Sequence, residues 1–311
     1  MLSYVQPQQS GGFEMKILNC VPNISEGKNQ DTINAVAEAI RSVPGVKLIS
    51  VSADEDHNRA VYSFLGEPNA VLEAAKRMAA EAVNRIDMAV HKGGHPRMGA
   101  VDVTPFIPVS GIETEEAVAI CKEYGKWVGE RGIPVFYYEE TATKPARVNL
   151  ADVRKGQYEG LEEKLRDPEW TPDEGPCQFV PQSGAFLVGV RLPLIAYNVN
   201  LWTEDVGIAK KIADSVRNMR GGYRYVRAMG LALEGTGMVQ VSMNLTNYLK
   251  TPIPRVTETI RSEAARYGVS VAGTEIVGAI PLKAMEEIMK HYLQCHDFTG
   301  EQVIEMNCLA E

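Results

Sequence analysis

Apolar residues recur along the chain with two periods, one typical of strands and one typical of amphipathic helices. In the first third, apolar runs predict strands at residues 16–21, 46–51, 59–65 and 101–109. Apolar positions at helical spacing predict helices at residues 31–43 and 68–88. The predicted order of elements over this part is therefore βαββαβ.

The same order is predicted a second time near the C-terminus. Strands are expected at residues 194–201, 226–233, 238–245 and 269–272, and helices at residues 203–219 and 251–267. A helix at 114–130, a strand at 134–138 and an irregular segment at 140–184 separate the two repeats, and a last helix is expected at 281–293. Two split βαβ repeats predict an α+β fold with two ferredoxin-like βαββαβ lobes, a duplication, with additional helices.

Three segments follow from this order. Residues 1–15 lack the cationic and apolar regions of a signal peptide and are predicted to be an N-terminal extension. Residues 16–185 are predicted to form an N-terminal subdomain and residues 186–311 a C-terminal subdomain. Ligand sites often lie where two lobes meet, so a ligand is expected between them.

Composition narrows the functional class. The chain has 311 residues, of which 45% are hydrophobic and 23% charged, and its formal net charge is −8. An acidic balance argues against a nucleic-acid partner, and no apolar run approaches the ~18–20 residues of a membrane-spanning helix. The five cysteines are odd in number and widely spaced, which predicts a reducing cytoplasm rather than a disulfide framework.

The segment His91–Gly99 reads HKGGHPRMG and concentrates candidate chemistry between a predicted helix and a predicted strand. Its glycines and proline disfavour a helix, so two imidazoles and two cations are expected on a loop that approaches a ligand closely. That combination suits proton transfer beside an anionic substrate. A solvated turn with scattered charges is the alternative. A metal site is not expected, because glycines interrupt the spacing of His91 and His95 and no glutamate follows His91.

Several segments together resemble the formiminotransferase (glutamate formimidoyltransferase) family in its single-function form, without the cyclodeaminase domain. The matching stretches begin with CVPNISEGK at residues 20–28, Asn58-Arg59, HKGGHPRMGAVDVTPFIPV from His91, and GP at 175–176 with FVP at 179–181. They continue with NVNL at residues 198–201, QVSMN at 240–244 and VGAIPLK at 277–283, so they span nearly all of the chain.

The resemblance implies a one-carbon-group transferase of histidine degradation. It would move the formimino group from N-formimino-L-glutamate to the co-substrate tetrahydrofolate, giving 5-formiminotetrahydrofolate and L-glutamate. It implies small-molecule partners, a homodimer in the cytoplasm, and a separate cyclodeaminase as a further candidate partner. The family's catalytic histidine corresponds to His95, which would act as general base and then general acid.

Other candidate residues surround this histidine. The stretch corresponding to the family's folate contact comprises Gly175, Pro176, Phe179, Val180, Pro181 and Gly184. Arginine and lysine side chains are expected to bind the substrate carboxylates, and the candidates are Arg59, Lys92, Arg97 and Arg191. The acidic pair of the vertebrate enzymes is replaced here by Ser50 and Ser52, so the supporting carboxylate is left open among Asp54, Asp56 and Asp102.

Two other functions use the same residues. One is formyl transfer between 5-formyltetrahydrofolate and glutamate, which needs the same pocket and base. The other is a non-catalytic folate-binding protein, against which the presence of His95 argues.

Overall fold

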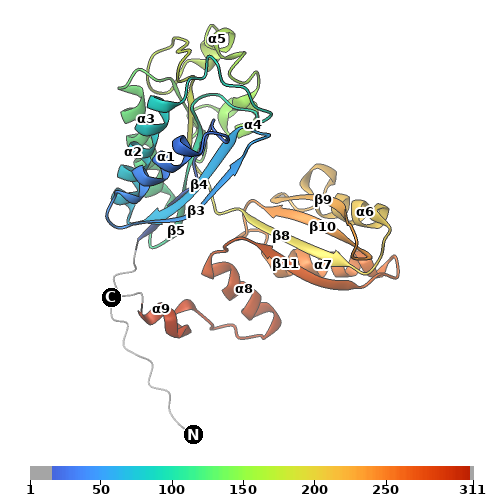
Figure 1. Ribbon diagram of the computed structural model, residues 1–311. Helices are drawn as coiled ribbons and strands as arrows, with labels where there is room; N and C mark the ends of the chain where they lie inside the picture. The colour runs from blue at the N-terminus through green and yellow to red at the C-terminus, as the bar shows by residue number, and fades with distance from the viewer. Residues whose placement is uncertain (1–15, 309–311) are drawn as a thin grey trace. The chain divides into compact units, whose positions relative to one another are not determined.

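The computed structural model describes residues 16–308 and divides into two compact units, the first ending at Arg191 and the second beginning at Leu192 (Figure 1). Each unit combines one β-sheet with helices, so the predicted α+β class is confirmed. The predicted extension at residues 1–15 lies outside the described residues.

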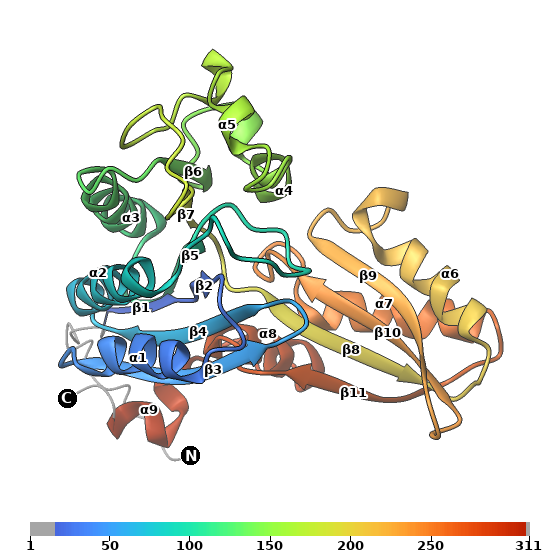
Figure 2. The same cartoon turned by 45° about the horizontal axis from the view of Figure 1, so that its top comes forward.

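The first unit begins with an antiparallel sheet whose strands run in the order β3-β4-β1-β5. The strands are β1 (Ile17–Cys20), β2 (Asn23–Ile24), β3 (Val46–Asp54), β4 (Arg59–Gly66) and β5 (Val101–Ser110). Helices α1 (Gln30–Arg41) and α2 (Pro68–Arg85) lie side by side (Figure 2). Their apolar residues pack with Leu18, Cys20, Tyr62 and Phe64 in one core. Residues of β4 alternate between buried and half-buried, as expected for a strand with one face in that core.

Two further strands extend this sheet beyond β5. Strand β7 (Phe186–Val190) is parallel to β5, and β6 (Val135–Glu139) is parallel to β7. Helix α3 (Thr114–Gly129) contributes to the core on one face, while α4 (Leu150–Arg154) and α5 (Leu161–Lys164) belong to a second cluster with Phe136 and Leu187. All five residues of β7 are therefore buried.

Strand β7 was not predicted from the sequence. Its sequence FLVGV is a continuous apolar run, the pattern of a parallel strand buried on both faces, and it has no alternation to reveal it. The boundary expected after residue 185 precedes this strand, whose pairing with β5 and β6 places it in the first unit.

In the described part of the second unit, four strands form a sheet in the order β11-β8-β10-β9, and every neighbouring pair is antiparallel. The elements are β8 (Ile195–Leu201), α6 (Val206–Val216), β9 (Val226–Leu233), β10 (Met238–Leu245), α7 (Ile253–Ala265), β11 (Val271–Val277), α8 (Leu282–Tyr292) and α9 (Ile304–Cys308). Strands joined through a helix are separated by one other strand, which is the split βαβ arrangement. The helix expected from Thr203 begins later, because Asp205 caps it by accepting from the Gly207 N–H.

The irregular segment between β6 and β7 is fixed by a buried ion pair. Arg147 is 1% exposed and donates to Asp173 at 2.7 Å. Its other nitrogen donates to the carbonyls of Glu169 (2.8 Å) and Thr171 (2.6 Å). Asp173 also accepts the backbone N–H of Tyr137 on β6, so one charge pair attaches this segment to the sheet.

We expect Arg147→Met to lower the free energy of unfolding by about 3–5 kcal/mol, because the Asp173 carboxylate would stay buried without its cation. Arg166→Met is the matched control. That side chain is 74% exposed in its pair with Glu162, and its loss should change stability by less than about 1 kcal/mol. Urea unfolding would measure both, and equal losses in the two variants would contradict the assigned role of Arg147.

Candidate active site

The segment His91–Gly99 is irregular, as predicted, and lies against the turn between β3 and β4. The N–H groups of Gly94 and His95 donate to the carbonyls of Asp56 and His57, each at 3.4 Å. Gly93 is needed for this approach, because a Cβ there would lie 2.4 Å from the His57 carbonyl oxygen.

Asn58 joins three segments at this point. Its backbone is in the left-handed region, with φ of 49°, a conformation that asparagine tolerates better than most residues. Its side chain accepts from the Gly27 N–H at 2.9 Å and donates to the Lys92 carbonyl at 2.8 Å. Its own carbonyl lies 3.2 Å from Nε2 of His91.

His91 is held as a structural residue. Its Nδ1 accepts from Nε of Arg97 at 3.2 Å, so its proton lies on Nε2, which donates to the Asn58 carbonyl. Burial is the main cause that lowers the pKa of His91, and the charge of Arg97 adds to it. Arg97 also forms two hydrogen bonds with Glu159, at 3.0 and 2.8 Å, and donates to the His91 carbonyl. Its guanidinium is therefore largely engaged within the protein.

His95 has a different environment. Burial, as the largest cause, and the charges of Arg59 and Arg154 together lower its pKa from 6.5 to about 4. The imidazole is therefore neutral at pH 7 and has a lone pair available to accept a proton.

Asp102 holds the end of the histidine loop in place, and its carboxylate is not free to act as a base. Its carboxylate accepts from the Met98 N–H at 2.9 Å and pairs with Arg154. Burial raises its pKa, whereas Arg154 opposes that rise. Asp54, another candidate carboxylate, is bound by the backbone and the ring of His57 at 2.9 and 2.7 Å, and these hydrogen bonds lower its pKa.

Two arginines with unmatched hydrogen-bond donors, Arg59 and Arg154, act on the charge of His95, and Arg191 belongs to the same group through Tyr138. The Nε atoms of Arg59, Arg154 and Arg191 are buried and have no partner among the described residues, and neither has the hydroxyl of Tyr138. Arg154 connects them, because its charge affects the pKa of both His95 and Tyr138, and Arg191 also affects Tyr138. Buried donors without acceptors are rare in native proteins, so an anionic ligand is the natural partner for this group. We call these three arginines, Arg59, Arg154 and Arg191, together with the uncharged hydroxyl of Tyr138, the cationic group.

The stretch expected to contact folate divides between two places. Gly184, with φ of +64°, pairs with Gly99 at the end of the histidine loop. Phe179 packs on Tyr158, with ring centroids 5.4 Å apart, and the Tyr158 hydroxyl donates to the Pro181 carbonyl at 2.7 Å.

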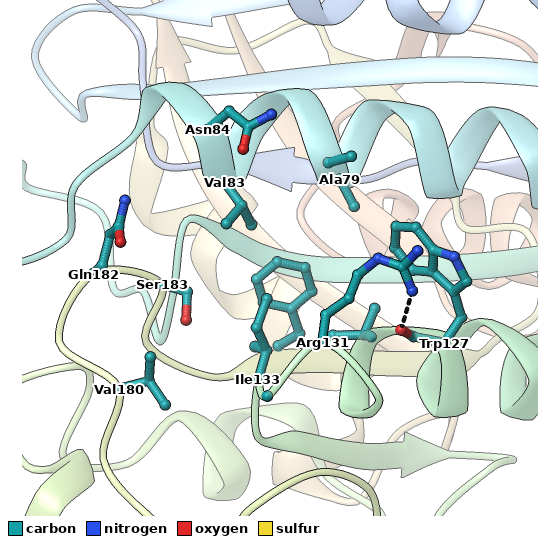
Figure 3. Close-up of a pocket in the computed structure, with 13 residues that line it drawn as sticks. Ala79, Val83, Asn84, Trp127, Arg131, Ile133, Val180, Gln182 and Ser183 are labelled. Atoms are coloured by element: carbon teal, nitrogen blue, oxygen red, sulfur yellow. Dashed lines mark hydrogen bonds between the residues drawn. The ribbon is translucent and has the colours of Figure 1, made fainter.

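The remainder of this stretch lies farther from the loop. Gly175 approaches the Ile133 carbonyl, with Pro176 next to it in the chain. Val180 lines a cavity of about 330 Å³ with Gln182 and Ser183 (Figure 3).

The residues that line that cavity include few groups able to act as acids or bases. Part of its wall comes from α2 and from the end of α3, and among the described residues that line it Arg131 is the one with a formal charge. The Arg131 guanidinium stacks 3.6 Å above the Trp127 ring and donates to the Trp127 carbonyl at 2.9 Å (Figure 3). His95, Arg59 and Arg191 are not among its lining residues, so the reactive group lies elsewhere.

Sequence reasoning missed three residues of this site. Arg154 and Tyr138 come from a segment and a strand without a recognisable motif, and only folding brings them to His95 and Arg191. His57 had a local signal, since Asp54 lies three residues before it and binds its ring. Lys92, in contrast, was predicted to bind substrate and is exposed.

Both units match models of known protein families. Residues 17–191 match the formiminotransferase domain, N-terminal subdomain, and residues 196–306 match the formiminotransferase domain. The chain belongs to the formiminotransferase family. A glutamate formimidoyltransferase of Streptococcus pyogenes is 46% identical over 95% of this chain and 99% of its own length. One from Thermoplasma acidophilum is 44% identical over 94% and 97%.

Bifunctional relatives are longer. The formimidoyltransferase-cyclodeaminase of Mus musculus is 42% identical over 89% of this chain, which covers 52% of that protein. The predicted transferase class is confirmed by these matches, and the bacterial and archaeal relatives align with this chain over almost their whole lengths. Within residues 16–308, no helix is both long and apolar enough to span a membrane.

We expect the His95 imidazole to titrate near pH 4 in the free protein, well below 6.5. Arg59→Gln should raise that pKa, because it removes a positive charge that disfavours protonation. Arg85→Gln, which changes an exposed arginine paired with Glu81, should leave it unchanged. Histidine-ring NMR during a pH titration would measure the three values.

The lowered pKa of His95 also makes the stability of the protein depend on pH. Because the folded pKa is below that of the unfolded chain, the unfolded chain binds this proton first as the pH falls. Stability should therefore decrease between about pH 6.5 and pH 4, and less so in His95→Gln. An identical pH dependence in both proteins would contradict the lowered pKa.

Proposed function

We propose that this chain transfers the formimino group from N-formimino-L-glutamate to tetrahydrofolate, with His95 moving the proton. The observation that carries the proposal is a neutral imidazole whose pKa is lowered by the nearby Arg59 and Arg154, two arginines whose buried Nε atoms lack partners among the described residues. Both substrates carry carboxylates, and a guanidinium binds a carboxylate through two parallel hydrogen bonds. The relatives named as glutamate formimidoyltransferases support the same reaction.

The reaction needs one proton carrier. Nitrogen N5 of tetrahydrofolate attacks the formimino carbon, and a tetrahedral intermediate forms. His95 takes the proton from N5 and gives it to the departing glutamate nitrogen. The new N5–C bond replaces the C–N bond to glutamate, so the products are 5-formiminotetrahydrofolate and L-glutamate.

Substrate binding would prepare the base. A pKa near 4 makes His95 a weak base, and part of that lowering comes from Arg59 and Arg154. Carboxylates bound to the cationic group would offset these charges and raise the pKa of His95 toward neutrality, where general base catalysis is most effective. Arg97 would act as a positioning residue, since Glu159 and His91 already occupy its guanidinium.

Turnover of purified protein tests this assignment. We expect activity with tetrahydrofolate and formiminoglutamate, and His95→Ala should lower kcat by roughly two to four orders of magnitude, the range for loss of a general acid–base group. His296→Ala, which changes an exposed histidine of the second unit, is the control and should keep full activity.

Other outcomes would change the proposal. Turnover only with 5-formyltetrahydrofolate and glutamate would make the reaction a formyl transfer. Tight folate binding without any turnover would leave a binding protein. Near-normal kcat in His95→Ala would remove His95 from the mechanism.

Arg191→Gln tests the cationic group separately. Loss of one charge-assisted carboxylate contact should raise KM for tetrahydrofolate or for formiminoglutamate by about 10- to 100-fold. Arg166→Gln, at an exposed arginine of the same unit, should change neither constant. Unchanged KM values in Arg191→Gln would show that Arg191 does not bind substrate.

A further inference from the structure

The proposed reaction takes up a proton that the transfer step does not supply. The formimino group is an amidine, and it is cationic both on glutamate and on N5 of tetrahydrofolate. The proton that leaves N5 is consumed when the glutamate nitrogen departs as a neutral amine. An aliphatic amine is protonated at neutral pH, so each turnover must bring a further proton from solvent to this nitrogen. Until that proton arrives, the amine keeps its lone pair and can attack the new formimino group, which reverses the transfer.

His95 is poorly suited to bring in this proton. Its pKa of about 4 leaves the ring unprotonated at neutral pH in the free protein, and the proton that it takes from N5 has already been given up. A group that imports protons needs access to solvent and a side chain of a type that titrates near neutral pH, which is histidine. His57 is the histidine that the fold brings to the loop of His95 from another segment.

His57 lies in the turn between β3 and β4, directly against the histidine loop. The His95 N–H donates to the His57 carbonyl at 3.4 Å, and a Cβ on Gly93 would lie 2.4 Å from the same oxygen. The charge of His57 is among those that lower the pKa of His95, so the two side chains interact electrostatically. The His57 side chain is 52% exposed, so its ring reaches solvent as well.

Asp54 holds His57 with both of its carboxylate oxygens. Oδ1 accepts from the His57 backbone N–H at 2.9 Å, and Oδ2 lies 2.7 Å from Nδ1 of the ring. These hydrogen bonds lower the pKa of Asp54, so the carboxylate is ionised at neutral pH and has no proton to donate. Nδ1 of His57 therefore carries the hydrogen of this contact, and Nε2 is the atom that can gain and lose a proton.

The other charged groups of this turn leave Nε2 available. Among residues 16–308, Asp54 is the one side chain that forms a hydrogen bond or an ion pair with the His57 ring. Glu55 and Asp56 belong to the same turn and are exposed, and Arg59 lies opposite Asp54 in the register of β3 and β4. The ring thus has a fixed orientation, one bound nitrogen and one nitrogen without a partner in the protein.

We infer that His57, oriented by Asp54, carries a proton from solvent to the amine nitrogen of the departing glutamate. The inference rests on the proposed formimino transfer and adds a second histidine to it. The Nε2–H bond of the His57 imidazolium breaks, and the lone pair of the glutamate nitrogen takes the proton. The resulting ammonium has no lone pair and cannot attack the formimino carbon. The neutral ring then takes a proton from water or buffer.

Rescue by an external proton carrier tests this assignment. In dilute buffer at pH 7, His57→Ala should lower kcat with tetrahydrofolate and formiminoglutamate by about 10- to 100-fold, at or below the lower end of the range for acid–base groups, because water replaces part of the lost transfer. Both KM values should stay nearly unchanged. Free imidazole, added at constant pH and ionic strength, should restore kcat of His57→Ala in proportion to its concentration and should not change kcat of the wild type.

Two further variants serve as controls. His296→Ala, at an exposed histidine of the second unit, should have the kcat of the wild type at every imidazole concentration. Asp54→Asn keeps an acceptor for the His57 N–H but loses the carboxylate that orients the ring, so it should lower kcat less than His57→Ala does. The double variant should be no slower than His57→Ala, because the two residues act as one unit.

The outcomes separate this inference from the proposed function. Full kcat of His57→Ala in dilute buffer would overturn the inference and leave the proposed transfer intact. A loss of kcat that imidazole does not restore would also overturn it, because the effect would then come from the shape of the turn. Absence of turnover in the wild type with this substrate pair would overturn the proposed function and the inference with it.

Discussion

Asn58 is the residue on which the geometry around His95 depends. The histidine loop has no helix or strand of its own, so its position relies on contacts with neighbouring segments. The Asn58 amide binds both Gly27 and Lys92, and its carbonyl binds the His91 ring. Aspartate would lose the donor to Lys92, and most other residues would disfavour the left-handed backbone. One amide therefore couples the first strands to the loop that contains His95.

The charges around His95 favour function at the expense of stability. Burying guanidinium N–H groups without acceptors costs free energy, and Arg59, Arg154 and Arg191 each do so. The structure offsets part of that cost at Arg154, which pairs with the buried Asp102. The remaining donors are suited to an anionic substrate, and violations of ordinary burial rules of this kind concentrate at functional sites.

Local signals in the sequence predicted most elements of the fold. Strands β9 and β10 occupy the predicted residues, because a Glu-Gly-Thr-Gly turn separates two apolar runs. Strand β7 was missed, since a strand buried on both faces has no polar alternation.

The residues of the candidate site also differ in how well the sequence predicts them. His95 lies in a conspicuous motif, whereas Arg154 and Tyr138 become relevant only when β6 pairs with β7 and α4 packs on β6. Pairings between distant segments of this kind have no periodicity in the sequence.

The two sheets differ in the chemistry of the faces that their own helices leave uncovered. Arg59 belongs to β4, and Arg191 follows β7, so the first sheet contributes cations. The second contributes amides and the Glu275 carboxylate, which attract donors instead.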